Sequence, residues 1–199
     1  MFTQFSRIIY SGWFLFWFLI LCIPLLISFL CIDVFFSKNE YLYFTATKYT
    51  IIILFNITLI KININAQENW KLDNIGIIIA NHSSKIDPAL FFLIIKRPIK
   101  FLAKKQISKY QILNYIFNKF CIYVDRDTQS IPLSSYKSAI AHVNKNNILI
   151  IFPEGRRNID ISNSYQPELK NGAFKISNIT HKKIGGLAIL IILVFVLMI

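Results

Sequence analysis

The sequence predicts an α/β fold preceded by an N-terminal membrane-embedded helical segment. Three observations lead to this prediction. A charge-free apolar run covers residues 13–32, short apolar runs typical of buried strands recur in the rest of the chain, and segments long enough for helices separate them. At 199 residues, the chain can bury one domain core in addition to the N-terminal segment.

The apolar run reads "WFLFWFLILCIPLLISFLCI", and it is as long as a helix needs to cross the core of a bilayer. A secretory signal peptide would have a shorter apolar core and a small-residue cleavage site, so we expect residues 1–40 to remain attached as a membrane anchor. Pro24 lies in the middle of the run. A kinked span and a helical hairpin within one leaflet therefore both remain open.

Hydrophobic patterns place the remaining elements. "YTIIILFNITLI" predicts a buried helix or an interfacial element. "IKININ" alternates with period two, as half-exposed strands do, whereas "IGIIIA" and "NILIIF" have the continuous apolar character of strands covered on both faces. The expected strands are 60–65, 75–80, 99–103, 120–125 and 147–152, and the expected helices are 88–96, 106–119, 131–145 and 167–180.

The composition of the chain indicates which classes of partner it can bind. The net charge of +12 favours a polyanionic partner, either nucleic acid or an anionic membrane surface. Lysine, asparagine, isoleucine and phenylalanine are all abundant, as in AT-rich coding sequences, so the charge is weak support for nucleic acid. With 55% hydrophobic residues, the chain favours a membrane, and we expect no nucleic-acid partner.

The sequence lacks the residues that several other classes of site need. Cys22, Cys31 and Cys121 have no paired spacing, which is typical of buried thiols. His142 and His181 fall in expected helices, no His/Cys/Asp cluster has metal-ligand spacing, and no Gly-x-Ser-x-Gly elbow is present. We therefore expect neither a metal site nor a serine hydrolase.

A histidine and an aspartate follow one buried strand in "NHSSKID". His82 lies just beyond the strand, at the carboxyl edge where open α/β sheets bind ligands. Asp87 is expected to be the N-cap of the next helix, with Pro88 at its first position. The same carboxylate can turn an oxygen toward His82, which leaves the other imidazole nitrogen free to accept a proton.

A second polar group follows another buried strand in "FPEGRRN". Glu154 and Gly155 form the expected turn, with Arg156 and Arg157 beside it. Arginine offers a forked donor suited to phosphate, and glycine lets the backbone approach a ligand closely; an exposed polar turn is the alternative interpretation. Further basic candidates at strand ends are Lys104, Lys105 and Arg126, although solvated charge is the simpler interpretation of the two lysines.

Together, "NHSSKID" and "FPEGRRN" resemble the motifs of the glycerolipid acyltransferase family, typified by the bacterial 1-acyl-sn-glycerol-3-phosphate (lysophosphatidic acid) acyltransferase. The resemblance extends over about residues 47–182 and includes "IKFLAKKQ", "YVDR" and "LKNGAFK" in order. It implies a mixed sheet flanked by helices. We accordingly expect an anchor at 1–40, an acyltransferase domain at 41–182 and an atypical apolar segment at 183–199.

The resemblance implies that His82 is a general base and that Asp87 orients it. The implied reaction moves an acyl group from acyl-CoA or acyl carrier protein, as co-substrate, to the free hydroxyl of lysophosphatidic acid, and it forms phosphatidic acid without a metal or other cofactor. The acceptor phosphate would be held by Arg126, Glu154, Gly155 and Arg157, with Arg156 in place of the usual threonine and Lys105 as a further candidate.

The resemblance also implies a bacterial-type inner (plasma) membrane, with the catalytic domain on the cytoplasmic side where acyl donors are found. Two alternatives remain open. The acceptor could be another lysophospholipid or glycerol 3-phosphate, because the motifs specify the reaction better than the substrate. The chain could also be a degenerate, inactive membrane protein, because residues 183–199 replace the strand with a Val-Pro type motif that relatives carry, as a truncated or frame-disturbed end would.

Overall fold

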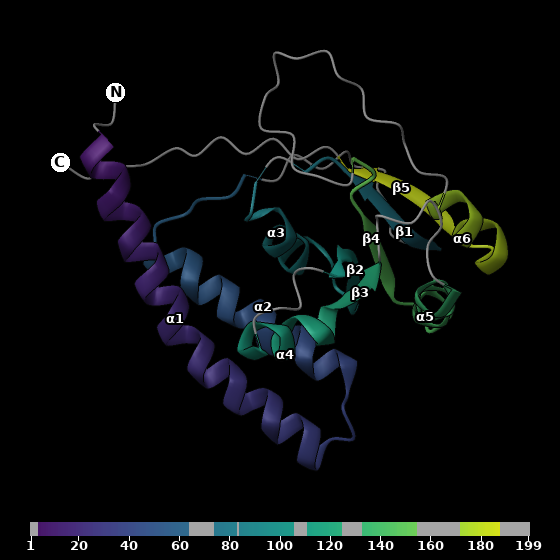
Figure 1. Cartoon of the computed structure of the whole chain (residues 1–199), viewed down its shortest axis with the longest axis horizontal. Coiled ribbons are helices and arrows are strands. Elements are labelled where there is room, and N and C mark those ends of the chain that lie inside the picture. Colours follow the sequence, from purple (N-terminus) through teal and green to yellow (C-terminus); the bar gives the residue numbers. More distant parts are fainter. Residues whose placement is uncertain are drawn as a thin grey trace. The chain divides into compact units, whose positions relative to one another are not determined.

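A computed structural model describes residues 4–63, 74–82, 84–105, 111–124, 133–154 and 172–187 of the chain. The chain divides into two compact units. The first contains helices α1 and α2, and the second contains a sheet with helices α3 to α6 (Figure 1). The two units are described separately.

The first unit is a pair of helices, α1 (Gln4–Phe35) and α2 (Glu40–Ile57). Helix α1 continues through Pro24 without a break. Within the described residues, α1 is the one helix that is long and apolar enough to cross a membrane, judged by length and composition alone. Large apolar side chains, among them Phe5, Phe16 and Leu30, are exposed along it. This surface has the character that a lipid environment stabilises.

Contacts at both ends hold α1 and α2 together as an antiparallel pair. Asn39 caps α2, because its side-chain oxygen accepts hydrogen bonds from the backbone N–H groups of the residues two and three positions later, at 2.9 and 3.3 Å. Near this turn, the rings of Phe29 and Tyr43 meet edge to face, with centroids 4.9 Å apart. At the other end, the hydroxyl of Tyr10 donates to the carbonyl of Thr58 at 2.9 Å.

The second unit is built on a five-stranded sheet. Its strands are β1 (Ile75–Ala80), β2 (Ile99–Lys104), β3 (Cys121–Val124), β4 (Ile148–Ile151) and β5 (Lys183–Leu187). They lie in the order β3-β2-β4-β1-β5, and each neighbouring pair is parallel. The helices are α3 (Asp87–Ile94), α4 (Gln111–Phe120), α5 (Leu133–Asn144) and α6 (Gly172–Thr180). The predicted α/β fold is confirmed.

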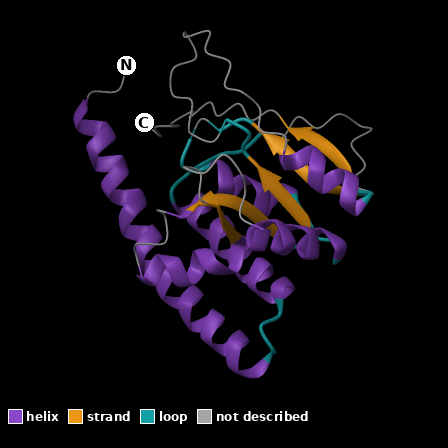
Figure 2. Cartoon of the chain, turned by 45° about the vertical axis from the view of Figure 1, so that its right-hand side comes forward, coloured by secondary structure: helices purple, strands orange, loops and turns teal. Residues whose placement is uncertain are grey.

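The sheet of the described residues is parallel, whereas the family resemblance implied a mixed sheet. A parallel connection must return the chain to the starting edge, which a helix between successive strands does. Each of the four connections from β1 to β5 contains such a helix. Figure 2 shows these helices on both sides of the strands, and such covering explains why β1 and β4 are buried almost throughout.

Two apolar layers fill the spaces between the sheet and its helices. Facing α5 and α6, strand side chains such as Leu102 and Leu149 pack with Val143 and Ile176. The opposite face is aromatic. Its ring contacts join α3, α4, β2 and the residue after β4, and the rings are Phe91, Phe92, Phe101, Phe120 and Phe152.

The amino edge of the sheet is closely packed. A Cβ added at Gly76 would lie 2.7 Å from Val143 Cγ1 and 2.7 Å from Lys182 Cβ, so only glycine lets α5 come this near to β1. At the same edge, the Arg97 guanidinium donates to the backbone carbonyl of Asn146 at 3.0 Å and to that of Ile75 at 2.9 Å. These bonds join the loops before β2 and β4 to the start of β1.

Most expected elements of the second unit agree with the structure. Strand β1 covers the same residues as the predicted 75–80, and the other predicted strands of the sheet and the predicted helices overlap their observed counterparts. The strand expected at 60–65 is wrong where it is described, because residues 60–63 form no strand; residues 64 and 65 lie outside the described residues. Residues 183–187, counted with the atypical end, form β5 and pair with β1.

Candidate active site

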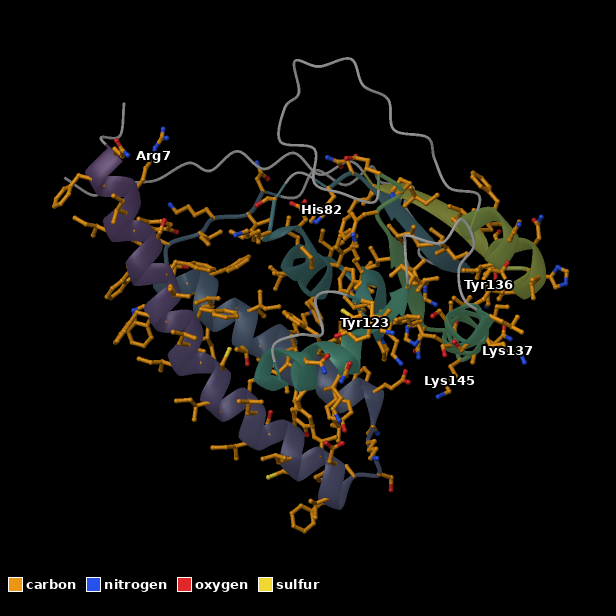
Figure 3. All side chains as sticks on the ribbon, viewed as in Figure 1. Arg7, His82, Tyr123, Tyr136, Lys137 and Lys145 are labelled. Carbon is orange, nitrogen blue, oxygen red and sulfur yellow. The ribbon has the colours of Figure 1, made fainter. Side chains whose placement is uncertain are left out.

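The two sequence motifs meet at the carboxyl edge of the sheet. Strands β1 and β4 are parallel neighbours, with Ile79 opposite Ile151. The residues that follow each strand therefore leave the sheet side by side, which brings His82 close to Phe152 although 69 residues separate them in the chain. Figure 3 labels His82 at one end of the sheet and Lys145, which precedes β4, toward the other.

His82 and Asp87 form a hydrogen-bonded pair. Nδ1 of His82 lies 2.8 Å from Oδ2 of Asp87. Asp87 is fully buried, whereas the His82 side chain is 20% exposed. The backbone N–H of Ser84 donates to the same carboxylate oxygen at 2.8 Å. The predicted contact between the two side chains is confirmed. The imidazole of His82 is partly exposed, and the carboxylate of Asp87 that bonds to it is buried.

The predicted N-cap role of Asp87 is wrong. The N-cap of α3 is Ile86, and no side-chain oxygen caps this helix end. Asp87 is instead the first helical residue, with Pro88 next to it in the first turn. Its Oδ2 turns back toward His82 and Ser84, so that oxygen is directed away from the first N–H groups of α3.

The pair has the arrangement of a base and its orienting carboxylate. An ionised carboxylate only accepts hydrogen bonds, so beside Asp87 the Nδ1 of His82 carries the proton. Nε2 then has a free lone pair and can take a proton from a substrate hydroxyl. Sequence reasoning missed the Ser84 amide as a third member; the donor is a backbone N–H, which every residue except proline carries, so the residue type at this position gave no signal.

An aromatic ring lies under the imidazole. The ring centroids of His82 and Phe152 are 4.4 Å apart, and their planes differ by 23°. Phe152 begins the "FPEG" motif, and sequence reasoning assigned it no role. Its only signal was its place as the last apolar residue of a buried strand run, and nothing in the sequence showed that its strand would neighbour β1.

The candidates for acceptor binding are described only in part. Glu154 follows β4, and its Oε2 is buried with no hydrogen-bond partner among the described residues. Lys105 is exposed directly after β2, at the same edge of the sheet, and Lys104 ends that strand half-buried. The other four candidates, Arg126, Gly155, Arg156 and Arg157, lie outside the described residues.

Strand β3, which ends two residues before Arg126 in the sequence, is fixed by side-chain contacts. The Tyr123 hydroxyl donates to Oδ1 of Asn114 at 2.9 Å, and the Ser135 hydroxyl donates to the Tyr123 carbonyl at 2.6 Å. Burial, with a smaller contribution from Cys121, raises the pKa of Tyr123 to about 12. The phenol is therefore neutral at physiological pH, and it serves as a hydrogen-bond donor.

A family comparison classifies the chain. The family model described as Acyltransferase matches residues 61–189, which is more than half of the sequence. The chain belongs to the acyltransferase family. This match includes both motifs and all of β5, and it confirms that the resemblance found in the motifs is to acyltransferases. Such enzymes act on an acyl donor and an acceptor.

Comparison with solved structures supports the fold of this acyltransferase. The chain is similar to the crystal structure of the 1-acyl-sn-glycerophosphate (LPA) acyltransferase PlsC from Thermotoga maritima, with a TM-score of 0.56 and 19% sequence identity. The similarity covers 83% of this chain and 71% of that one. No curated protein matches the sequence. Within the described residues, no group of three or more His, Cys, Asp or Glu side chains could hold a metal ion.

Proposed function

We propose that this acyltransferase transfers an acyl group from acyl-CoA or acyl carrier protein to the free hydroxyl of lysophosphatidic acid, forming phosphatidic acid. The observation that carries the proposal is the hydrogen bond of 2.8 Å between Nδ1 of His82 and Oδ2 of the buried Asp87. This hydrogen bond lies at the carboxyl edge of a parallel sheet, where open α/β sheets bind ligands, and beside the motif that contains Glu154.

In the proposed reaction, Nε2 of His82 takes the proton of the acceptor hydroxyl as its oxygen attacks the thioester carbonyl. The new C–O bond gives a tetrahedral oxyanion, which backbone amides near the His82 turn would stabilise. The C–S bond then breaks, and the departing thiolate receives the proton from the imidazolium. Asp87 stabilises that imidazolium, and no acyl-enzyme forms.

The acceptor phosphate is assigned to basic residues of the segments that carry the family resemblance. Arg126 and Arg157 offer forked donors, and Gly155 lets the backbone come close. Arg156 and Lys105 add positive charge. Glu154 supports this assignment, because a buried carboxylate oxygen without a partner among the described residues is suited to accept a hydrogen bond from one of these donors or from substrate.

The location proposed is the inner (plasma) membrane of a bacterial-type cell, with residues 1–40 as the anchor, residues 41–182 together with β5 as the acyltransferase domain and the residues after β5 as an atypical apolar segment. The long apolar α1 supports membrane association. The catalytic domain is placed on the cytoplasmic side because acyl-CoA and acyl carrier protein are cytoplasmic donors. A lipid acceptor is then held in the same membrane as the enzyme.

An acceptor competition experiment tests the substrate. Membranes containing the chain would receive labelled acyl donor with lysophosphatidic acid, glycerol 3-phosphate and a lysophospholipid with a capped phosphate, each alone and in pairs. The proposal expects phosphatidic acid as the dominant product and the strongest competition from lysophosphatidic acid. Preferential acylation of another acceptor would overturn the substrate while keeping the reaction, and absence of turnover with both donors would favour a degenerate, inactive protein.

A further inference from the structure

The imidazole of His82 is held by two contacts, one at Nδ1 and one at the face of the ring. An imidazole N–H donates in the plane of its ring, so the bond from Nδ1 to Asp87 sets the direction in which Nε2 points. This bond alone leaves the ring free to rotate about the line through the two atoms. The contact with Phe152 is made by the face of the imidazole, with centroids 4.4 Å apart and planes 23° from parallel.

We infer that Phe152 is a positioning residue of the acyl-transfer reaction, and that it fixes the plane of the His82 imidazole so that the Nε2 lone pair faces the acceptor hydroxyl. This inference rests on the proposed role of His82 as general base. Stacked and edge-to-face rings attract each other beyond their apolar burial, so Phe152 favours one ring orientation. A misplacement of about 1 Å at a reacting atom can lower a rate by about 100-fold.

Phe152 can define a plane because other rings hold it. It is 8% exposed. Phe101 of β2 lies nearly parallel to it, with planes 4° apart and centroids 6.2 Å apart. Phe91 of α3 meets it edge to face at 6.0 Å and is fully buried. The side chain is thus fixed between a strand and a helix.

The same rings link the two contacts of His82. Asp87 begins α3, and Phe91 lies one helical turn later on that helix. Because Phe91 packs against Phe152, the carboxylate that directs the imidazole and the ring that orients its plane belong to one packed unit. Phe152 lies on one face of the imidazole. The exposed part of the His82 side chain, 20% of its surface, is available to substrate.

Three variants separate positioning from packing. Phe152→Leu removes the ring and keeps an apolar side chain, whereas Phe152→Tyr keeps the ring. Phe120→Leu makes the same change elsewhere in the aromatic layer, at a buried ring that meets Phe92 edge to face. Thermal unfolding of each full-length variant in membranes or detergent would establish that it is folded.

Steady-state kinetics and NMR would then be measured on the same samples. We expect Phe152→Leu to lower kcat about 10- to 100-fold with little change in KM, Phe152→Tyr to restore most of kcat, and Phe120→Leu to keep most of it. With imidazole labelling, the three histidines give few signals, and His82→Ala assigns one of them. Its ring-current shift should persist in Phe152→Tyr and Phe120→Leu and disappear in Phe152→Leu.

Two results would overturn the inference: a wild-type kcat in Phe152→Leu, or an equal loss of kcat in Phe120→Leu, which would indicate packing of the core alone. Failure of the proposed function looks different. In that case His82→Ala would retain activity, while the ring-current shift, which does not depend on turnover, would still report the contact between His82 and Phe152.

Discussion

Nδ1 of His82 lies 2.8 Å from Oδ2 of Asp87, and the same oxygen accepts a hydrogen bond from the Ser84 backbone at 2.8 Å. The carboxylate is therefore fixed from two directions before any substrate binds. Asp87 is fully buried, which strengthens its electrostatic interaction with an imidazolium that forms during proton transfer. The pair is prearranged for one proton transfer at Nε2.

Replacing Asp87→Asn should lower kcat by about 10²–10⁴-fold and change KM little, because an amide can donate to Nδ1 and so place the proton on Nε2. Steady-state kinetics in membranes would measure this. The control is the double variant His82→Ala with Asp87→Asn. If the two residues act as a unit, the double variant is no slower than His82→Ala alone; additive losses would show that Asp87 acts independently.

Gly76→Ala should destabilise the sheet domain by about 1–3 kcal/mol, because the added Cβ would lie 2.7 Å from both Val143 Cγ1 and Lys182 Cβ. Gly186→Ala is the matched control, since a Cβ at Gly186 has no atom within 4 Å. Chemical denaturation monitored by circular dichroism would compare the two. Equal stability of both variants would show that α5 can move away from β1 without cost.

Cys121 should resist alkylation in the folded protein. Burial raises the pKa of its thiol to about 12, with Lys100 opposing the shift weakly. At pH 8 only about one thiol in 10⁴ would then be the reactive thiolate. Mass spectrometry after iodoacetamide treatment, in a variant lacking Cys22 and Cys31, would show slow modification in the fold and fast modification in denaturant. Rapid labelling of the folded protein would contradict the buried thiol.

The same shift predicts a pH dependence of stability. The protonated thiol of Cys121 is favoured in the fold, because its pKa rises from 9.0 to about 12. Its contribution to the free energy of unfolding is therefore complete below pH 9 and is lost as the pH rises through 12. The free energy of unfolding, measured from pH 8 to 11, should decline less in Cys121→Ala than in the wild type. Identical slopes in the two proteins would argue against Cys121 as the source of the pH dependence.

The sheet strands could be predicted from the sequence because their signal is local. "IGIIIA" and "NILIIF" are short, continuous apolar runs, and the structure has β1 and β4 there. "IKININ" carried an equally clear local alternation, yet residues 60–63 form no strand. A strand needs a partner as well as a pattern, and the sequence does not show which segments pair.

In the candidate site too, local contacts could be predicted from the sequence, and contacts between distant segments could not. The contact between His82 and Asp87 could be predicted because both lie in one strand–turn–helix segment. The cap assignment was wrong because a carboxylate can bond either forward into the helix or back into the loop, and the residue type is the same in both cases. The contact with Phe152 depends on β1 and β4 being neighbours, which is a property of the whole sheet.

The most direct measurement of the proposed chemistry is phosphatidic acid formation from lysophosphatidic acid and labelled acyl-CoA or acyl carrier protein, in membranes carrying the wild-type chain or His82→Ala. We predict turnover by the wild type and a loss of about 10²–10⁴-fold in the variant, since the variant has no base to take the hydroxyl proton. Equal activity of the two chains, or no activity of the folded, membrane-inserted wild type with either donor, would contradict the proposed chemistry.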